Sequence, residues 1–523
     1  MFLEVEEETS LARLQKQVHN LQKENIRLHD LLEVQREKNK ALNNKIRLFE
    51  KNMEERIKKA VDDLVKDVLK ENEKLKTENI SLKKILNNDS NNSGIPTSKT
   101  PISKDKRIPN SREKSGKVKG GQIGHKKHKL EKFNDGEITD TYVHILDSTK
   151  CNCGGNLVLV EKRYKDEFDI NVRLMKIRHE FGEYKCDSCH KKISVPIPNN
   201  LKEENQYGKG VQALALSLVN EGYVSFHRTK ELISGFTNNE MNMSEGYLAK
   251  LQKRCYQKLE EFDNELHKKI IKQPLIYWDD TVINIDKKRA CLRFYGTEKL
   301  AYYKAHEKKN KEGLDNDKIL SYLSDKTVVV HDHNKVNYND EYDFINAECC
   351  VHLIRDLNKQ NENLPRDWII KLINLLVDTN KKRKEFINQR IEYFDQEVTD
   401  KVSNEYDKII EEARNINKKD FNKYYGNDEK TLIKRLTDYK DNYLLWILRF
   451  DVPFSNNLSE RSLRSSKTKM KISGQFSNIS NAQYFARIKS YIETCKRNGL
   501  NPNTALQMLV DDKPYKVEDL KID

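Results

Sequence analysis

The order of strands and helices between residues 275 and 332 limits the fold of this chain more than any other feature. An apolar run at 275–278 leads into Asp279, and a second apolar run at 328–330 leads towards Asp332. Between them, apolar periodicity and turn residues predict strands at 281–285, 290–295 and 300–305, a helix at 313–323 and a strand at 327–330. The sequence therefore predicts an α+β domain with an aspartate at the end of two of its strands.

A third acidic residue, Glu460, lies on a predicted helix that begins after Pro453 and Ser455. Asn456, Glu460 and Arg464 follow at steps of four residues, so they share one helix face. The strand order is that of a ribonuclease-H-like core. Two strand-borne aspartates and a helix-borne glutamate can hold two divalent ions that act on a phosphodiester. The alternative is an ordinary solvated surface helix.

Five segments, taken in order, carry a resemblance to a known family. They lie at residues 120–128, 151–189, 278–281, 350–355 and 456–464. With these segments the chain resembles, over about residues 10–510, the DDE transposases of the insertion-sequence 66 family. The resemblance implies that Asp279, and not Asp280, binds metal together with Asp332 and Glu460. Strand geometry agrees, because neighbouring side chains point to opposite faces.

The same resemblance implies an activity and its cofactors. The expected reaction frees a 3′-hydroxyl at each element end and then joins it to target DNA. Two Mg²⁺ ions, or Mn²⁺ in their place, are the expected cofactors. The expected partners are double-stranded DNA, as terminal inverted repeats and target, and accessory proteins that the element could encode. The resemblance also places His352 and Arg355 beside the site, where they contact DNA or serve in local packing.

The net charge of +14 is concentrated in two segments. Residues 97–133 hold twelve Lys or Arg against three acids, and residues 461–471 hold five basic residues and no acid. The five are Arg461, Arg464, Lys467, Lys469 and Lys471. A basic segment beside a candidate site favours binding to a polyanion. A solvated lysine-rich face is the alternative for each segment.

The element at 120–128 combines glycines with basic residues. Its candidate DNA-binding residues are Gly121, Gln122, His125 and Lys126. Glycine permits close approach of the backbone to DNA, and lysine neutralises phosphate. The histidines are poor metal-ligand candidates because no cysteine lies at a suitable spacing.

Two cysteine pairs predict a structural zinc site. The four residues are Cys151, Cys153, Cys186 and Cys189. The first pair has the spacing CxC where the family usually shows CxxC, so His144 or His190 could replace one ligand. Unmetallated thiols are the alternative.

A cytoplasmic, nucleoid-associated protein is expected, with no membrane partner. The first residues are acidic, unlike a signal peptide, and no apolar run approaches the roughly 18–20 residues of a membrane span. Nine cysteines in a reducing compartment then indicate thiols or metal ligands, not disulfides.

Heptads that begin at Leu11 predict a coiled coil, with a break near 53–60. Asparagines recur at its core positions: Asn25, Asn39, Asn72 and Asn79. Buried asparagine favours a defined register, most simply in a parallel homodimer. An antiparallel hairpin within one chain is the alternative.

The predicted protein is therefore a multidomain α+β chain with seven segments. They are a coiled coil (1–90), a basic linker (91–135), a zinc module (136–200), a helical domain (201–268), the first part of the core (269–356), a helical insertion (357–448) and the last part of the core (449–523). Helices at 210–219, 225–235 and 244–254 suggest a helix-turn-helix that reads DNA, or else a plain bundle. The rival functions are a nuclease that only cleaves, and a zinc-containing coiled-coil DNA-binding regulator.

Overall fold

The computed structural model of the chain describes residues 68–82, 132–146, 150–170, 172–201 and 203–521. The chain divides into two units, Met1–Lys106 and Arg107–Asp523. In the first unit, the described residues 68–82 are helical. Most of the predicted coiled coil and the whole element at 120–128 lie outside the described residues, so both stay predictions.

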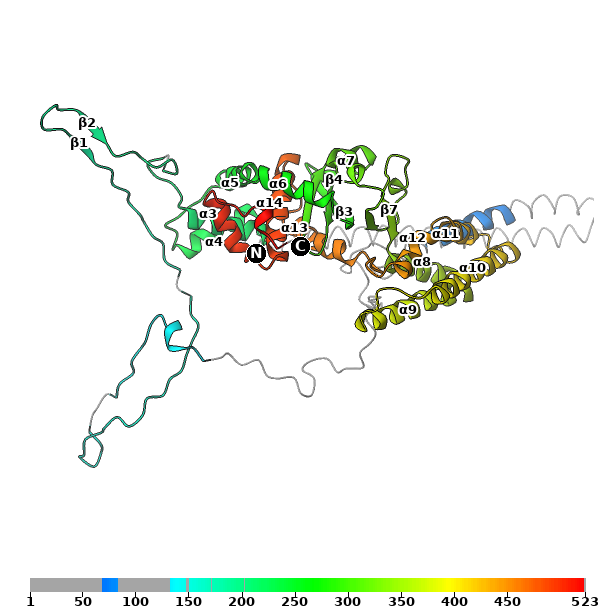
Figure 1. The fold of residues 1–523 in the computed structure, drawn as a ribbon, viewed down its shortest axis with the longest axis horizontal. Coiled ribbons are helices and arrows are strands. Elements are labelled where there is room, and N and C mark those ends of the chain that lie inside the picture. The colour runs from blue at the N-terminus through cyan, green and yellow to red at the C-terminus, as the bar shows by residue number, and fades with distance from the viewer. Residues whose placement is uncertain (1–67, 83–131, 147–149, 171, 202, 522–523) are drawn as a thin grey trace, which may run out of the picture. The chain divides into compact units, whose positions relative to one another are not determined.

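A five-stranded mixed sheet organises the second unit (Figure 1). Its strands are β3 (Leu275–Ile285), β4 (Lys288–Gly296), β5 (Ala301–His306), β6 (Val328–His331) and β7 (Ile345–Glu348). They lie in the order β5-β4-β3-β6-β7, antiparallel from β3 through β4 to β5 and parallel from β3 through β6 to β7. Asp286 and Lys287 connect β3 to β4 with positive φ at both positions, as a two-residue type I′ hairpin requires.

The sheet differs from the predicted one in three respects. Strand β3 runs through Asp279 without a break, because Asp279 pairs with Phe294 and Asp280 with Arg293 in the ladder to β4. The predicted helix at 313–323 is instead a short helix, α7 (Lys311–Asp317), followed by the 3-10 turn η3 (Leu320–Tyr322). Strand β7 was not predicted, because its residues Ile345–Glu348 lack the continuous apolar run that marks β6.

Helices cover both faces of the sheet. On one face, Ile276, Trp278 and Val329 join a core with the N-terminal and C-terminal helices. On the other, Val328 and Val330 contact the helices that follow β7. This division follows from the two-residue period of a strand, which sends alternate side chains to opposite faces.

In the described part of the second unit, four α-helices precede the sheet and two follow α13 (Asn457–Ser473). They are α3 (Lys209–Asn220), α4 (Phe226–Phe236), α5 (Glu245–Lys258), α6 (Glu260–Ile270), α14 (Ile479–Arg497) and α15 (Pro502–Val510), followed by the turn η5 (Val517–Asp519). Ser225 and Ser244 cap the starts of α4 and α5. The three predicted helices of this region are present, and α3 and α5 share a core with α14 and α15.

The outer edge of β5 is covered by α14. Ser490 Oγ accepts the backbone N–H of Tyr303 at 2.8 Å, and Thr494 Oγ1 accepts that of Ala301 at 3.1 Å. The hydroxyl of Thr494 also donates to the carbonyl of Ala301. Two hydroxyls one helical turn apart thus pair the backbone groups that an edge strand leaves open.

A helical region follows β6 and β7. After the turn η4 (Lys335–Asn337) and β7, it contains α8 (Cys350–Asn363), α9 (Asp367–Asn388), α10 (Gln396–Lys419), α11 (Gly426–Asp438) and α12 (Lys440–Leu448). The carboxylate of Glu429, fully buried, accepts bonds from Trp368, Arg366 and Asn417. At its base, the backbone N–H of Cys350 donates to the carbonyl of Phe454 at 3.1 Å. Residues 350–448 are therefore largely helical.

Helix α13 (Asn457–Ser473) is attached to β3 at both ends. Before its first turn, Asn456 donates to the carbonyl of Trp278 at 3.0 Å. After its last turn, the N–H of Phe476 donates to Asn284 and the N–H of Asp286 donates to Phe476. The helix therefore has a fixed position over the face of the sheet that carries Leu292.

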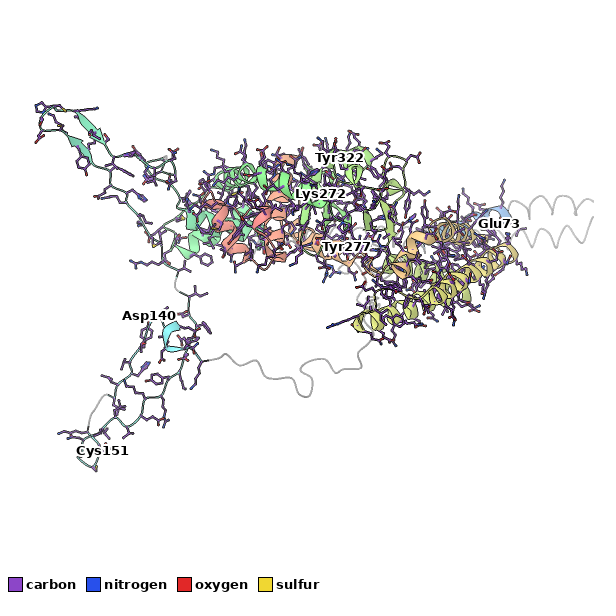
Figure 2. All side chains as sticks on the ribbon, viewed as in Figure 1. Glu73, Asp140, Cys151, Lys272, Tyr277 and Tyr322 are labelled. Atoms are coloured by element: carbon purple, nitrogen blue, oxygen red, sulfur yellow. The ribbon has the colours of Figure 1, made fainter. Side chains whose placement is uncertain are left out.

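The described residues between 132 and 201 contain little regular structure. They comprise η2 (Asp135–Glu137) and a two-stranded sheet of β1 (Glu183–Lys185) and β2 (Lys192–Ser194). Figure 2 shows their side chains, Cys151 among them, projecting from an extended chain. Apolar residues such as Val160 and Ile170 are 95% and 86% exposed, so this segment has no hydrophobic core of its own here. Nowhere in the described chain is a helix both long and apolar enough to cross a membrane.

Candidate active site

Strands β3 and β6 bring two of the three predicted acids to corresponding positions. The parallel register pairs Tyr277 with Val330, and Asp279 and Asp332 each follow two residues later. Glu460 lies in the first turn of α13, the helix that covers this part of β3. Residues separated by 181 positions in sequence, from 279 to 460, therefore face one region.

The carboxyl group of Asp279 is held in an environment that disfavours its charge. Burial, and then the nearby carboxylate of Asp332, raise its pKa to about 8. The backbone N–H of Asp280, which donates to Asp279 Oδ1 at 2.7 Å, and the amine of Lys467 act in the opposite direction. Close carboxylates with little solvent are typical of a site that holds a cation.

The neighbouring Asp280 points to the other face of the sheet. It pairs across the ladder with Arg293, and its carboxylate accepts from Lys309 Nζ at 2.6 Å. Asp279 instead shares a face with Phe294, whose cluster includes residues of α13. The alternation thus gives Asp279, and not Asp280, access to the region of Glu460.

His352 on α8 lies between two of the acids. Its Nδ1 is 2.8 Å from Asp332 Oδ1 and its Nε2 is 3.3 Å from Glu460 Oε1. Burial opposes the charged imidazole, but the bond to Asp332 and the contact with Cys349 outweigh it and raise the pKa of His352 to about 11. Arg355, one turn later, has Nη1 3.6 Å from Glu460 Oε1. Both residues therefore contact the carboxylates directly.

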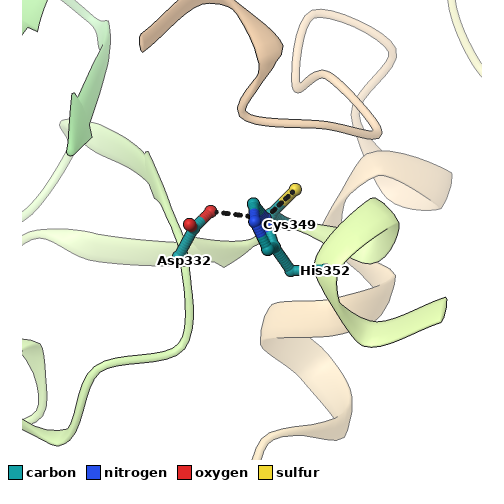
Figure 3. A group of neighbouring side chains, drawn as sticks. All are labelled: Asp332, Cys349 and His352. Atoms are coloured by element: carbon teal, nitrogen blue, oxygen red, sulfur yellow. Dashed lines mark hydrogen bonds and ion pairs between the residues drawn. The ribbon is translucent and has the colours of Figure 1, made fainter. Parts of the chain in front are cut away.

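Cys349 completes a compact group with Asp332 and His352 (Figure 3). Their ligand atoms all lie within 4.8 Å of one another, and no other such group of three occurs among the described residues. Each atom already has a protein partner, however. The Sγ of Cys349 accepts the backbone N–H of Asn456 at 3.2 Å, and His352 Nδ1 faces both Sγ and Asp332. In this structure the three side chains therefore bond to one another and to Asn456, and they do not form an open site for a soft metal ion.

The carboxylates offer oxygens that suit Mg²⁺ or Mn²⁺. Oε1 of Glu460 is buried and makes no hydrogen bond of acceptable geometry within the described chain, although His352 Nε2 and Arg355 Nη1 lie 3.3 and 3.6 Å from it. A buried carboxylate oxygen that has ion-pair contacts but no well-formed hydrogen bond keeps the capacity to accept a further cation. The mutual repulsion of the Asp279 and Asp332 carboxylates would likewise be relieved by a bound cation. The three acids therefore fit divalent ions.

A basic strip runs along the exposed side of α13. Arg461, Arg464, Lys467 and Lys471 are exposed, and Arg464 Nη2 lies 3.8 Å from Glu460 Oε2. Lys469, predicted to belong to the strip, is only 6% exposed and lies over the ring of Phe485. The prediction was wrong for Lys469 because its position in the helix turns it towards α14.

The two cysteine pairs lie in separate turns. In the first, Cys151 N–H donates to Gly155 O, and hydrogen bonds from Gly155 N–H and Cys151 lower the pKa of the Cys153 thiol. In the second, backbone N–H groups of Cys189 and Ser188 lower the pKa of the Cys186 thiol. No three of the four sulfurs lie close enough together to hold one ion in the described structure.

Sequence reasoning missed two residues at the site. Asn456 and Cys349 each contact elements that carry the acids, Asn456 through Trp278 and Asp332 and Cys349 through His352. A signal existed for Cys349, since Cys349 and His352 are spaced by three residues and share a helix face. Asn456 was placed on the face of Glu460, but its link to β3 depends on tertiary structure.

Residues 204–484 match the profile of the family described as "Transposase IS66 family". The matched range contains Asp279, Asp332, His352, Glu460 and the basic strip. No curated protein sequence matches the chain.

Proposed function

Because the chain belongs to the IS66 family of transposases, we propose that it binds the ends of its element and catalyses metal-dependent cleavage and strand transfer of DNA. The carboxylates of Asp279, Asp332 and Glu460 are its proposed metal ligands. The observation that carries this assignment is their convergence from β3, the end of β6 and the first turn of α13.

A ribonuclease-H-like core is part of the proposal. Its support is a mixed sheet in the order β5-β4-β3-β6-β7. Strands β3, β4 and β5 form an antiparallel meander, and β6 and β7 run parallel to β3. Helices on both faces and a helical insertion between β7 and α13 fit the same core.

The ions, when bound, supply stabilisation for the charge that develops on the phosphodiester oxygens. The protein contributes the geometry. Asp279 must give up a proton before it can serve as a ligand, since its pKa is raised by burial. His352 keeps Asp332 and Glu460 oriented towards each other through its two ring nitrogens.

The exposed cations of α13 are proposed to contact the DNA backbone. Arg461, Arg464 and Lys467 project from the helix that carries Glu460, so a bound strand would lie close to the acids. On α5, Lys250, Lys253 and Arg254 are exposed, which supports a second DNA contact there.

A structural zinc ion is proposed for residues 136–200. Its support is the lowered pKa of one thiol in each cysteine pair, since zinc binds the thiolate. If one ion joined the two cysteine turns, the exposed apolar side chains of this segment would be brought together and could be buried against one another.

A strand-joining assay tests the function. Purified protein is given pre-cleaved element ends with a free 3′-hydroxyl, a supercoiled target and Mg²⁺. Joined product is expected, and it should disappear with Glu460→Gln. Cleavage of intact ends without any joining would instead indicate a nuclease, and specific binding without either reaction would indicate a regulator.

A further inference from the structure

Asn456 lies where several parts of the candidate site meet. It is fully buried, at 0% exposure. Its Nδ2 donates to the carbonyl of Trp278 at 3.0 Å and lies 3.5 Å from Asp332 Oδ1. Its backbone N–H donates to Cys349 Sγ. One residue thus contacts the strand of Asp279, the carboxylate of Asp332 and the start of α8.

The side chain of Asn456 does not cap the helix that it precedes. Asparagine at this position usually accepts an N–H from the first turn, but Asn456 makes no such bond. Its backbone carbonyl instead accepts from Ser459 Oγ at 2.9 Å and from the N–H of Glu460 at 3.3 Å. The side chain is therefore left to interact with β3 and Asp332.

The bond to Trp278 fixes which end of the amide faces the site. Only the NH₂ group can donate to a carbonyl oxygen, so the same NH₂ group faces Asp332. The other end, Oδ1, has no hydrogen-bond partner among the described residues. An unpaired buried oxygen lowers stability, so the residue is poorly explained as a contribution to folding alone.

We propose that Asn456 is a positioning residue that sets the spacing of the three carboxylates and thereby their affinity for divalent cations. The inference rests on the proposed function of this site. Through its side chain it holds Asp332 against β3, and through its backbone carbonyl it places the first turn that carries Glu460. Residues that orient metal ligands typically change metal affinity by about 10–100-fold.

Asn442 offers a matched control. Its Nδ2 donates to the carbonyl of Asn346 at 2.9 Å and fastens α12 to β7. The bond has the same chemistry as that of Asn456 to Trp278, a side-chain amide to a strand carbonyl. Asn442 makes no contact with the three acids among its described hydrogen bonds.

The test compares full-length wild type, Asn456→Ala, Asn456→Ser and Asn442→Ala. Free Mn²⁺ is measured by electron paramagnetic resonance during titration, and the unfolding midpoint is measured in EDTA. Asn456→Ala is expected to weaken Mn²⁺ binding by about 10–100-fold while losing no more thermal stability than Asn442→Ala. The control should bind Mn²⁺ like wild type.

Wild-type Mn²⁺ affinity in both Asn456 variants would overturn the inference, as would an equal loss in Asn442→Ala. Should Asn456→Ala fail to fold, Asn456→Ser decides, because serine is well tolerated before a helix. Cleavage of element ends by wild type is scored separately. Its absence contradicts the proposed function, whereas the Mn²⁺ affinities still decide the role of Asn456.

Discussion

The imidazole Nδ1 of His352 lies 2.8 Å from Oδ1 of Asp332. The two residues come from α8 and from the end of β6, and both were singled out from sequence, one as a DNA or packing residue and one as a metal ligand. Their contact means that the cation nearest the candidate ligands is supplied by the protein itself. A substitution of His352 should therefore alter the position and charge of the Asp332 carboxylate, and a substitution of Asp332 should alter those of the His352 ring.

Replacing each acid by its amide should abolish cleavage. Asp279→Asn, Asp332→Asn and Glu460→Gln each remove a negative ligand with little change of shape, so a loss of roughly 10³-fold or more is expected. Binding to element ends should persist in a mobility-shift assay. Asp280→Asn is the control, since Asp280 faces Lys309 on the other side of the sheet, and it should retain activity. Robust Mg²⁺-dependent cleavage by any of the three would remove that residue from the site.

Asp279 should make the metal-free protein less stable as pH rises. Its folded pKa of about 8 lies above the ordinary value of 3.8, so between these values the folded state binds more protons than the unfolded state. The contribution of protonated Asp279 to the free energy of unfolding is then fully present below about pH 4 and is lost as the pH rises to about 8. Asp279→Asn should remove this slope in EDTA and raise stability at pH 8 by about 1–3 kcal/mol. Denaturant unfolding at pH 5 and pH 8 checks it; parallel pH profiles for both proteins would contradict it.

Lys469 should destabilise the protein at neutral pH. Burial lowers its pKa to about 8 from 10.5, so between these values the unfolded state binds more protons and stability rises with pH. Lys469→Met should stabilise the protein by about 1–3 kcal/mol at pH 7, and the gain should shrink as the pH rises from about 8 to 10.5. The exposed Lys471→Met serves as the control and should change unfolding by less than about 0.5 kcal/mol.

Purified protein should contain about one zinc per chain. Cys186→Ser or Cys189→Ser should lose the zinc and weaken DNA binding while leaving Mn²⁺ binding at the carboxylates unchanged. Elemental analysis of freshly prepared protein measures the zinc content, and fluorescence anisotropy with labelled element ends measures DNA binding. Zinc-free protein that binds ends normally would show that the cysteines have no structural role.

Deleting residues 1–90 should leave a folded protein that binds single ends but does not pair them. The predicted heptads supply a dimer contact, and transposition requires two ends in one complex. Sedimentation measures the effect directly. A full-length protein that stays monomeric at micromolar concentration, free and with DNA, would favour the hairpin within one chain.

Those elements could be predicted whose residues show the periodicity of a strand or a helix within a single segment. Apolar periodicity predicted most of β4 and β5, an apolar run predicted β6, and the four-residue steps of α13 put Glu460 and Arg464 on one face. The extent of β3 was missed because the polar pair Asp279-Asp280 looks like a strand end, while cross-strand pairing with β4 carries the ladder through it. The contacts of Asn456 and the burial of Lys469 depend on which helix lies beside α13, which no local pattern encodes.

The bond between Cys350 and Phe454 closes the helical region at its base. About a hundred residues separate these two, and within them α12 is also bonded to β7 through Asn442. Helix α13 is bonded to β3 at both of its ends. Helix α8 is tied to the acids through His352 and Arg355, whereas α9, α10 and α11 can change in length without displacing Glu460. Variation in length between related chains should therefore accumulate in α9–α11, which contain none of the residues at the candidate site.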